Sequence, residues 1–478
     1  MRNDDGHAAA SSAPVAELVA ELGADVVLTA RDAVSRYRED RAHDPNASDP
    51  LAVVRARDTA DVQTALRWAT RHGIPVVPRG AGTGLSGGAS ARANAIVVTT
   101  ERMRDLVIDP VTRIATVGPG LLNAELKAAA AAEGLWYPPD PASWEICSIG
   151  GNVATNAGGL CCVKYGVTAD YVLGLELVLA DGTAITLGGP LIKDVAGLSL
   201  TRLLVGSEGT LGIITSVVVR LVPAPPPART VVATFGSPAA AGEAVLAVAA
   251  TLRPSMLEYM DRSTVRAVEA ELHMGLDTAA AATIVARTEV TDPARDDAAA
   301  MVETLRAAGA TVAREVTGTE ADAYVRARQR AIPAVERTGR LLLGDVGVGL
   351  RRLADLLAGA ERIAQEHDVT IAMIAHAGDG NTHPLVPLPE DIDGQERAHR
   401  AYAELTMLAV SLGGTITGEH GVGRLKRAWL REQVGGDVLA LTARVKRAFD
   451  PAGLLNPGVI LEPDDDRVEW PTPKGRSE

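Results

Sequence analysis

The chain has 478 residues, of which 47% are apolar and 22% charged, which predicts a packed globular protein of two or three domains and excludes a disordered or fibrous one. With 60 acidic and 47 basic residues, its net charge of -13 has the wrong sign for a nucleic-acid or anionic-bilayer partner. The 3 cysteines form no Cys-x-x-Cys pair, so we expect a reducing, cytoplasmic setting, with any membrane association made through a partner. Neither an export signal nor a transmembrane stretch of about 18 apolar residues is expected.

Strand and helix signals alternate from the start of the chain. After a helical lead-in over residues 1–45, the apolar run Leu51–Val54 predicts a strand. Asp58 is a suitable N-cap for the helix that follows, and Gly73 is placed to end that helix before a strand from Ile74. This pattern predicts a strand–helix–strand unit.

A proline-rich spacer divides the chain. From residue 96 to about 222, short β-rich runs with brief helical pieces predict an α+β organisation. The run PAPPPA over residues 223–228 is a stiff spacer, after which strand and helix signals resume with long Ala/Leu/Arg helices. We therefore expect a domain boundary near residue 225 and a frayed polar tail over residues 463–478.

The first of three glycine clusters is PRGAGTGLSGG, over residues 78–88. Gly82, Gly84 and Gly87 match the dinucleotide fingerprint G-x-G-x-x-G. That fingerprint requires a helix immediately afterwards, but only residues 89–95 separate the cluster from the strand expected at Ile96. The cluster predicts a strand–loop–strand whose backbone N–H groups form a nest for an anion such as a pyrophosphate. The alternative is a flexible surface loop.

Two further clusters repeat this pattern, CSIGGNVATNAGG over residues 147–159 and LLVGSEGTLGIIT over residues 203–215. Paired glycines let a flat ligand lie against the backbone, and Ser148, Asn152, Thr155 and Asn156 offer hydrogen bonds. An ordinary turn-rich connection is the alternative. Three such loops in one domain favour a single extended cofactor over three unrelated turns.

These motifs resemble the vanillyl-alcohol oxidase / p-cresol methylhydroxylase superfamily. The strings PVVPRGAGTGLSGGA, PPDPAS, CSIGGNVATNAGG, KYGVT and LTRLLVGSEGTLGIIT carry the resemblance, which extends from Leu51 to Ile460. Within the superfamily the chain is similar to the FAD-linked subunit of glycolate oxidase and to D-lactate and D-2-hydroxyglutarate dehydrogenases. The resemblance implies a two-subdomain FAD-binding domain of the p-cresol methylhydroxylase type over residues 46–225. It also implies an α+β substrate (cap) domain with an antiparallel sheet over residues 226–420, and a segment over 421–462 that returns to the FAD domain.

The resemblance also implies how FAD is held. Members that attach flavin covalently tend to use a histidine in the first loop, and this chain has none there, so we expect non-covalent FAD. The expected FAD-binding residues are Pro78, Arg79, Gly80, Ala81, Gly82, Thr83, Gly84, Leu85, Ser86, Pro139, Asp140, Ser148, Ile149, Gly151, Asn152, Thr155, Asn156, Gly158, Tyr165, Gly209, Ile213 and Asn456.

Histidines flank a tight turn after the spacer, in AHAGDGNTHP. His376 and His383 lie on either side of an Asp-Gly-Asn reversal that excludes a helix and could bring both imidazoles to one point; a structural role is the alternative. Farther on, Glu419 and His420 follow a strand-like run, and a helix is expected near Val422. Two imidazoles and a carboxylate suit Zn²⁺ or Mn²⁺. The resemblance implies that His376, His383 and Glu419 bind a divalent metal and that His420 is the catalytic base.

The substrate carboxylate requires a cation, and RARQRAIPA resembles the Arg-bearing segment of the family. It nominates Arg328, with Arg326 and Arg330 as competitors and a solvated basic helix face as the alternative. Relatives that take dicarboxylates carry a lysine where this chain has Leu343, two residues before Asp345. After Asp345-Val346-Gly347-Val348 the usual proline and polar residue are also absent. We therefore expect a small monocarboxylate.

The predicted function is FAD-dependent oxidation of glycolate or D-lactate to the 2-oxo acid, with the hydride passing to flavin N5 and the hydroxyl proton to His420. The alternatives are a flavin enzyme of the same fold acting on another alcohol or a 2-hydroxy diacid, a metal-dependent hydrolase, and a non-catalytic subunit of an electron-transfer complex. No cysteine run for an iron–sulfur cluster is present. We expect an external electron acceptor, which could be a quinone, a cytochrome, an electron-transfer flavoprotein or an iron–sulfur subunit, and a homodimer is compatible with the sequence.

Overall fold

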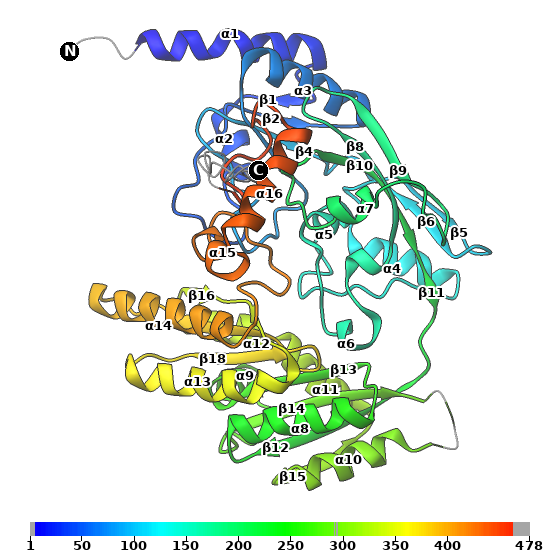
Figure 1. The fold of residues 1–478 in the computed structure, drawn as a ribbon, viewed down its shortest axis with the longest axis vertical. Helices are drawn as coiled ribbons and strands as arrows, with labels where there is room; N and C mark the ends of the chain where they lie inside the picture. Colours follow the sequence, from blue (N-terminus) through cyan, green and yellow to red (C-terminus); the bar gives the residue numbers. More distant parts are fainter. Residues whose placement is uncertain (1–4, 291, 293–294, 462–478) are drawn as a thin grey trace, which may run out of the picture.

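The computed structural model describes residues 5–461 except residues 291 and 293–294, so the predicted tail over 463–478 lies outside the described residues. The chain forms two halves (Figure 1). It crosses from the first half to the second after strand β11 (Val222–Pro223) and returns after helix α14 (Ile392–Ser411).

The N-terminal part contains a four-stranded sheet with three buried parallel strands. Its spatial order is β1 (Val27–Leu28), β2 (Ala52–Arg55), β4 (Ile96–Thr99) and β3 (Val76–Arg79), with β1 antiparallel to β2. Helices in this part are α1 (Asp5–Leu22), α2 (Arg31–Val34), η1 (Ser35–Tyr37) and α3 (Thr59–His72). Asp58 caps α3 by accepting a hydrogen bond from the Asp61 N–H, and Gly73 ends it with a φ of 63°. The predicted strand–helix–strand unit is confirmed, and a loop without a helix joins β3 to β4.

A five-stranded antiparallel sheet completes the first half. Its order is β5 (Leu106–Asp109), β6 (Ile114–Val117), β10 (Ile213–Arg220), β8 (Val172–Val178) and β9 (Ala184–Gly188), and β7 (Leu135–Trp136) pairs with β11. The helices here are α4 (Asn123–Ala132), α5 (Ile149–Thr155), α6 (Cys162–Tyr165), η2 (Thr168–Asp170) and α7 (Leu200–Leu204). Buried residues of this sheet and of α4 and α5 form one apolar core.

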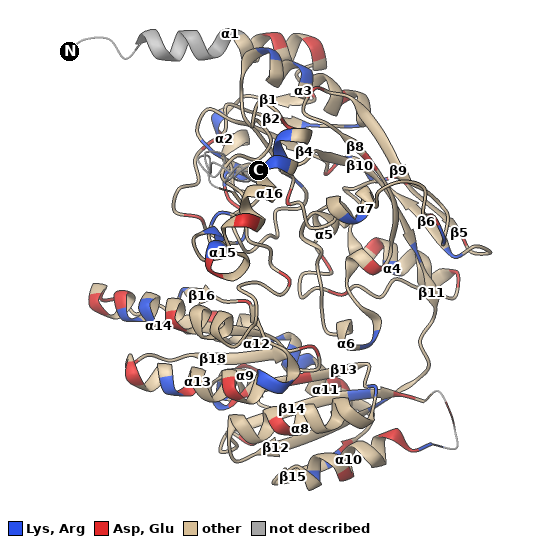
Figure 2. Cartoon of the chain, viewed as in Figure 1, with Lys and Arg blue, Asp and Glu red and all other residues tan. Residues whose placement is uncertain are grey.

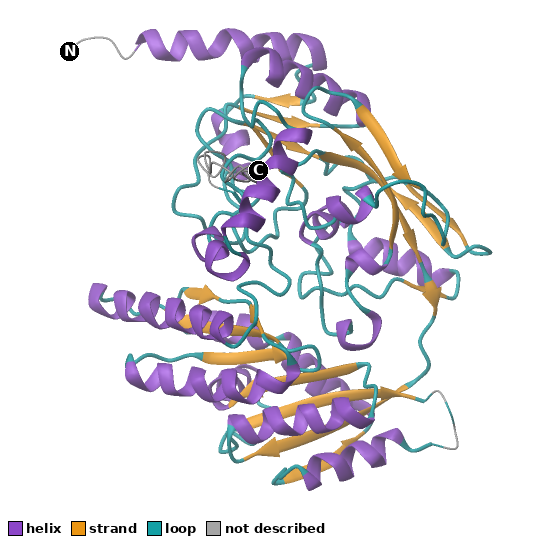
Figure 3. Cartoon of the chain, in the orientation of Figure 1, coloured by secondary structure: helices purple, strands orange, loops and turns teal. Residues whose placement is uncertain are grey.

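The second half is an antiparallel sheet between two helix layers (Figure 3). The strand order is β15 (Val312–Val316), β12 (Ala228–Phe235), β14 (Ala282–Glu289), β13 (Met256–Asp261), β18 (Ala372–His376), β19 (Asn381–Pro387) and β16 (Leu341–Leu343), with β17 (Val346–Gly347) also on β19. One face packs against α8 (Pro238–Thr251), α10 (Asp297–Ala307), α13 (Leu353–Glu366) and α14, and the other against α9 (Arg262–Leu272), α11 (Gly318–Gln329) and α12 (Ala331–Glu336). The helix η3 (Leu350–Arg352) precedes α13.

The alternation of side chains along β13 places a charged residue on the second face. Leu257 and Tyr259 belong to the core of the first face, whereas Met256 and Met260 belong to the core of the second. Glu258 lies between them at period two, so its side chain is on the same face as those of Met256 and Met260. The strand pairing of β13 with β18 brings it close to His376.

The C-terminal segment returns to the first half, as the fold class predicted. Leu455 forms a β-bridge with Val76, and the Asn456 N–H donates to the Val76 carbonyl at 2.8 Å. The helices of this segment are α15 (Arg427–Val434) and α16 (Gly436–Phe449). The expectation of a helix near Val422 was wrong, because residues 421–425 form backbone and side-chain hydrogen bonds with the first half instead of a helical ladder.

Charges of both signs are interspersed over the surface (Figure 2). Along α14, for example, the acidic Asp393 and Glu396 are followed by the basic Arg397 and Arg400. The negative net charge is thus spread out rather than collected on one element. Within residues 5–461, apart from the gaps named above, every helix is too short or too polar to cross a bilayer.

Candidate active site

A cavity of about 740 Å³ lies between the two halves. Its wall includes most of the residues that the sequence nominates, contributed by both halves. The nominated residues that line it are Pro78, Arg79, Gly80, Ala81, Gly82, Thr83, Gly84, Leu85, Ser86, Asp140, Ser148, Gly151, Asn152, Thr155, Gly158, Gly209, Ile213, Arg328, His376, His383, Glu419 and His420.

The loop between β3 and β4 is fixed by hydrogen bonds to other segments of the first half. Arg79 donates to the carbonyls of Glu39 and Ala89, and the Ala81 N–H donates to the Ser148 hydroxyl at 3.2 Å. Gly82 has a φ of 73°, and a Cβ there would collide with the Arg79 guanidinium. The N–H groups of residues 82–86 donate no hydrogen bond to the described part of the chain, so they suit a phosphate-bearing ligand.

The second glycine cluster adds polar groups to the same wall. Ser148 caps α5 by accepting from the Gly151 N–H, and Asn152 Nδ2 is buried without an acceptor among the described residues. Asp140 accepts from the Cys161 N–H at 3.2 Å, and burial raises the pKa of its carboxyl to about 6. The amide of Asn152 is therefore available to a ligand in the cavity, whereas both oxygens of Asp140 already contact Cys161.

Five of the nominated FAD-binding residues do not line the cavity, and most of them make contacts within the protein. Ile149 is fully buried, and the Pro139 carbonyl accepts from Asn123. Asn156 accepts from the Ala169 N–H, and Tyr165 donates to Glu289. Asn456 accepts from Arg424 and donates to the carbonyls of Gly88 and Glu208, so its amide holds loops together.

The hairpin of β18 and β19 brings both histidines to Glu419, as the turn between them predicted. The Nε2 atoms of His376 and His383 lie 3.4 and 3.1 Å from the same oxygen, Glu419 Oε1. Their Nδ1 atoms face other acceptors, the Glu258 carboxylate at 3.0 Å and the Gly344 carbonyl at 3.3 Å. Hydrogen bonds at Nδ1 leave both Nε2 atoms facing Glu419, where they could bind a cation in the arrangement that metal-binding histidines use.

The electrostatics of this cluster favour an ionised carboxylate. Burial would raise the pKa of Glu419, but His376 and His383 outweigh it and hold the pKa well below its usual range. Burial would lower the pKa of His376, but Glu258 and Glu419 outweigh it and raise the pKa well above its usual value. The three ligand atoms lie within 4.8 Å of one another, so this donor set fits a divalent ion.

Arg328 lies near the end of α11 with only 5% of its side chain exposed. Its Nη2 forms a 2.7 Å ion pair with Glu258, and its Nε is buried without an acceptor among the described residues. Arg330, by contrast, is 45% exposed and pairs with Glu271. Of these two arginines, Arg328 is the better placed to receive a carboxylate inside the cavity.

Comparisons with known proteins agree with this geometry. Residues 50–188 match a family described as FAD binding domain, and residues 224–460 match FAD linked oxidases, C-terminal domain. The glycolate oxidase subunit GlcD of Bacillus subtilis is 39% identical over 423 residues, which cover 87% of this chain and 90% of that protein. The chain belongs to the FAD-linked oxidases.

Other members of the family are similar over the same length. A D-lactate dehydrogenase of Archaeoglobus fulgidus is 36% identical, covering 87% of this chain and 93% of that protein. A D-2-hydroxyglutarate dehydrogenase of Xanthomonas citri is 33% identical, covering 87% and 90%. The structure of p-cresol methylhydroxylase with substrate bound matches with a TM-score of 0.77 at 19% identity, covering 94% and 96%. The predicted family, fold class and enzyme class are therefore confirmed.

Glu258 is a residue of this FAD-linked oxidase that sequence reasoning missed. The carboxylate is 1% exposed and joins Arg328 to His376, although it lies 118 residues from that histidine. The available signal was a lone charge in the apolar strand Met256–Asp261, which the burial of its neighbours makes costly unless it is paired.

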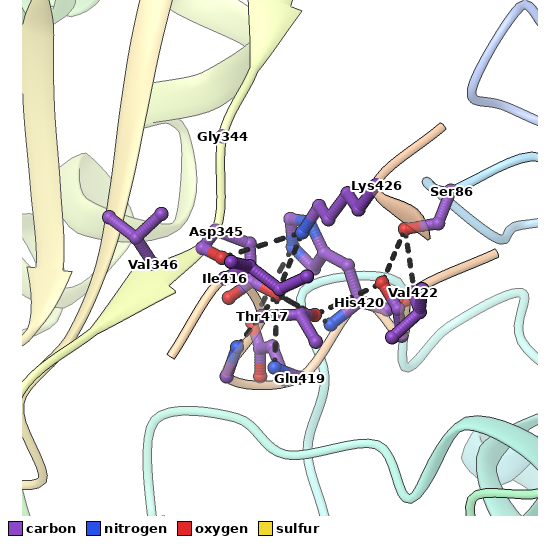
Figure 4. Close-up of polar contacts among 12 residues, drawn as sticks. Ser86, Gly344, Asp345, Val346, Ile416, Thr417, Glu419, His420, Val422 and Lys426 are labelled. Atoms are coloured by element: carbon purple, nitrogen blue, oxygen red, sulfur yellow. Dashed lines mark hydrogen bonds and ion pairs between the residues drawn. The ribbon is translucent and has the colours of Figure 1, made fainter. Parts of the chain in front are cut away.

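Asp345 also has a role that the motifs did not reveal, since the sequence identifies it only as part of a substrate-wall pattern. Figure 4 shows its carboxylate at the centre of polar contacts that reach Thr417, Glu419, His420 and Lys426. Burial would raise the pKa of Asp345, but Lys426 and His420 outweigh it and hold the pKa well below its usual range. The turn that carries Glu419, an expected metal ligand, and the expected base is thus fixed by one buried anion.

Proposed function

We propose that the protein is a FAD-dependent dehydrogenase that oxidises a small 2-hydroxy acid, of the glycolate or D-lactate type, to the 2-oxo acid. One observation carries the proposal: FAD-type glycine loops, a three-ligand cluster, His420 and Arg328 all line one cavity. Relatives named as a glycolate oxidase subunit and a D-lactate dehydrogenase support this substrate class.

The cofactors would be held by residues from both halves. FAD would lie non-covalently on the glycine loops, and His376, His383 and Glu419 would hold a divalent ion, Zn²⁺ or Mn²⁺. When bound, the flavin accepts the α-hydrogen with its electron pair, and the ion polarises the substrate oxygens.

Two side chains would act on the substrate directly. Arg328 binds its carboxylate through a guanidinium that is already oriented by Glu258. His420 accepts the hydroxyl proton at Nε2. Burial lowers the pKa of His420 to about 4, so the imidazole is neutral at pH 7, the form that a proton acceptor requires.

The cavity wall near Arg328 supports a short substrate. Ile332, Leu343 and Ile374 line it together with Arg326 and Arg330. Leu343, which stands where relatives that take dicarboxylates carry a lysine, cannot pair with a second carboxylate. A 2-hydroxy acid with a hydrogen or methyl substituent would meet this apolar wall without leaving a charge unpaired. We therefore favour glycolate or D-lactate over a 2-hydroxy diacid.

The electrons would leave to an external acceptor such as a quinone, a cytochrome, an electron-transfer flavoprotein or an iron–sulfur subunit. The 3 cysteines of the chain are Cys147 and the adjacent Cys161 and Cys162, a spacing that suits no iron–sulfur cluster. A homodimer and an association with a membrane through a partner stay predictions.

Anaerobic bleaching of the bound flavin tests the proposal. The purified protein is expected to be yellow and to lose its flavin absorbance with glycolate or D-lactate, and to respond less to L-lactate or 2-hydroxyglutarate. Bleaching only by phenols, amines or simple alcohols would favour another flavin oxidoreductase, and a colourless protein would favour a hydrolase. The His420→Ala variant is expected to keep FAD and lose bleaching; retained turnover would remove His420 from the role of base.

A further inference from the structure

The two oxygens of the buried Asp345 carboxylate have different surroundings. Oδ2 accepts from the Thr417 hydroxyl at 2.6 Å and from the N–H groups of Gly418, Glu419 and His420 at 3.0, 3.1 and 2.9 Å, and it lies 3.2 Å from Lys426 Nζ (Figure 4). Oδ1 is buried and accepts nothing from the described residues. One oxygen therefore fixes the turn over residues 417–420, and the other is available for a different partner.

The imidazole of His420 has a matching unpaired atom. Its Nδ1 is buried without a partner among the described residues, while its Nε2 lies 3.8 Å from Glu419 Oε1. The ring stacks on that of His383 at 4.9 Å and 13°, and His383 also directs Nε2 to Glu419 Oε1. His383 Nδ1 is 3.9 Å from Asp345 Oδ1, so the unpaired carboxylate oxygen lies beside this pair of stacked rings.

One water molecule can join these atoms. A carboxylate oxygen of Asp345 and a ring nitrogen from each histidine all lie within 4.8 Å of one another. Three atoms so spaced can be reached from one central point at about 2.8 Å or less, the length of an ordinary hydrogen bond. Asp345 Oδ1 and His420 Nδ1 are unpaired among the described residues, and a buried water needs two to four polar partners.

A second cation is a poorer occupant of the same place. With Nε2 of His383 bound to the proposed ion, its Nδ1 carries the hydrogen that faces the Gly344 carbonyl at 3.3 Å and cannot ligate a second ion. The ammonium of Lys426 already lies against the carboxylate of Asp345. The Nδ1–H of His383 and the ammonium of Lys426 both repel a cation, whereas neither excludes a water molecule.

We propose that Asp345 is a positioning residue for His420: Oδ2 holds the turn, and Oδ1 accepts, through one water, the hydrogen on His420 Nδ1. This proposal rests on the proposed function. With Nδ1 protonated, the Nε2 lone pair faces the substrate hydroxyl. The proton from that hydroxyl forms a bond to Nε2, and the resulting imidazolium keeps its Nδ1 hydrogen, so Asp345 stays ionised throughout.

The Asp345→Asn variant distinguishes the proposed roles of the two carboxylate oxygens. An asparagine can place its carbonyl where Oδ2 receives the turn, but it then presents NH₂ in place of Oδ1, a donor instead of an acceptor. The rate constant for anaerobic flavin reduction is expected to fall by up to about 10⁴-fold, the loss found when a base is left in the wrong tautomer. Metal per FAD and the substrate concentration for half-maximal rate are expected to stay within about threefold. Thr417→Val, which removes one donor to Oδ2 only, is the matched control and should reduce the rate less than about threefold.

The histidine tautomer provides a readout independent of turnover. In zinc-loaded, ¹⁵N-histidine-labelled protein at pH 7, with the His420 signals assigned from the Ala variant, His420 should carry its hydrogen on Nδ1 in the wild type and on Nε2 in Asp345→Asn. If Asp345→Asn folds poorly, the double variant Asp345→Asn/Lys426→Met also removes the ammonium that the substitution leaves unpaired. The same move of the His420 hydrogen from Nδ1 to Nε2 is expected in it.

A flavin-reduction rate in Asp345→Asn within about threefold of the wild type would overturn the proposal. So would an unchanged tautomer, or a loss of metal that accounts for the whole rate effect. If no 2-hydroxy acid reduces the wild-type flavin, the proposed function fails, and the tautomer alone decides the role of Asp345.

Discussion

Single buried carboxylates orient the functional side chains of this molecule. Glu258 contacts His376 Nδ1 at 3.0 Å and Arg328 Nη2 at 2.7 Å, and it is 1% exposed. One anion therefore sets the tautomer of a proposed metal ligand and the direction of the proposed substrate-binding guanidinium. The substrate and metal subsites are coupled through this residue.

Replacing Glu258 with Gln is expected to weaken both subsites. The neutral amide cannot balance Arg328, and it can present only one oxygen to two donors. We expect metal affinity to fall by about 10- to 100-fold, as for other residues that support a metal ligand, and the half-saturating substrate concentration to rise. Metal analysis after dialysis and flavin-reduction kinetics measure the two effects.

The control is Glu289→Gln. Glu289 is also buried and pairs with Lys164 and Tyr165, which are not among the proposed metal ligands. The Glu289→Gln variant should therefore leave the metal content unchanged. Equal metal loss in both variants would mean that Glu258 acts only through general stability.

At the level of elements, the segment after His420 is clamped between two glycine loops of the first half. Ser86 donates to the carbonyl of Gly421 at 2.8 Å, and its own carbonyl accepts from the Arg424 N–H. Glu208 accepts from the N–H groups of Val422 and Gly423, both at 2.8 Å. The expected FAD loops thus also position the turn that carries the proposed base, His420.

The clamp predicts a severe effect of Gly423→Ala. Gly423 has a φ of 54°, and a Cβ would lie 1.9 Å from the Ser86 carbonyl oxygen. Gly413 has a φ of 76°, and a Cβ there would have no described neighbour within 4 Å, so Gly413→Ala should cost only the strain of the left-handed backbone, about 1–2 kcal/mol. Thermal unfolding and FAD titration should show a larger loss of Tm and weaker FAD binding for Gly423→Ala; equal losses would rule out the clamp.

Glu208 gives the same contact a pH dependence. Burial raises the pKa of its carboxyl from 4.5 to about 7. The folded state therefore holds this proton more tightly than the unfolded state, and the stabilisation is complete below pH 4.5 and lost as pH rises to about 7. This difference in pKa between the folded and unfolded states corresponds to about 3 kcal/mol in the free energy of unfolding.

The Glu208→Gln variant has no proton to lose at this position. Relative to this variant, the wild type should lose Tm between about pH 5 and pH 8. Thermal unfolding of both FAD-loaded proteins at the two pH values measures the difference. A Tm difference that does not change with pH would show that Glu208 does not titrate in this range.

Over the whole molecule, the sequence predicted those parts of the site that local patterns encode. His376 and His383 flank a turn that is visible in the sequence, and the helix before β3 is bounded by its own caps. Glu258 and Asp345 were not identified, because their partners come from strand register and from a loop 72 or more residues away. Contacts between residues so far apart produce no recognisable motif in the sequence. The only local sign of them is a charged residue within an apolar run.

Both halves of the molecule contribute to one proposed site, in which flavin reduction by a 2-hydroxy acid depends on the ion held by His376, His383 and Glu419. The rate of anaerobic flavin bleaching by D-lactate or glycolate tests this dependence, before and after a chelator removes the metal and again after the metal is returned. We expect the stripped protein to stay yellow and to resist bleaching, and Zn²⁺ or Mn²⁺ to restore the rate. Bleaching at an unchanged rate in metal-free protein would show that the ion takes no part in the reaction.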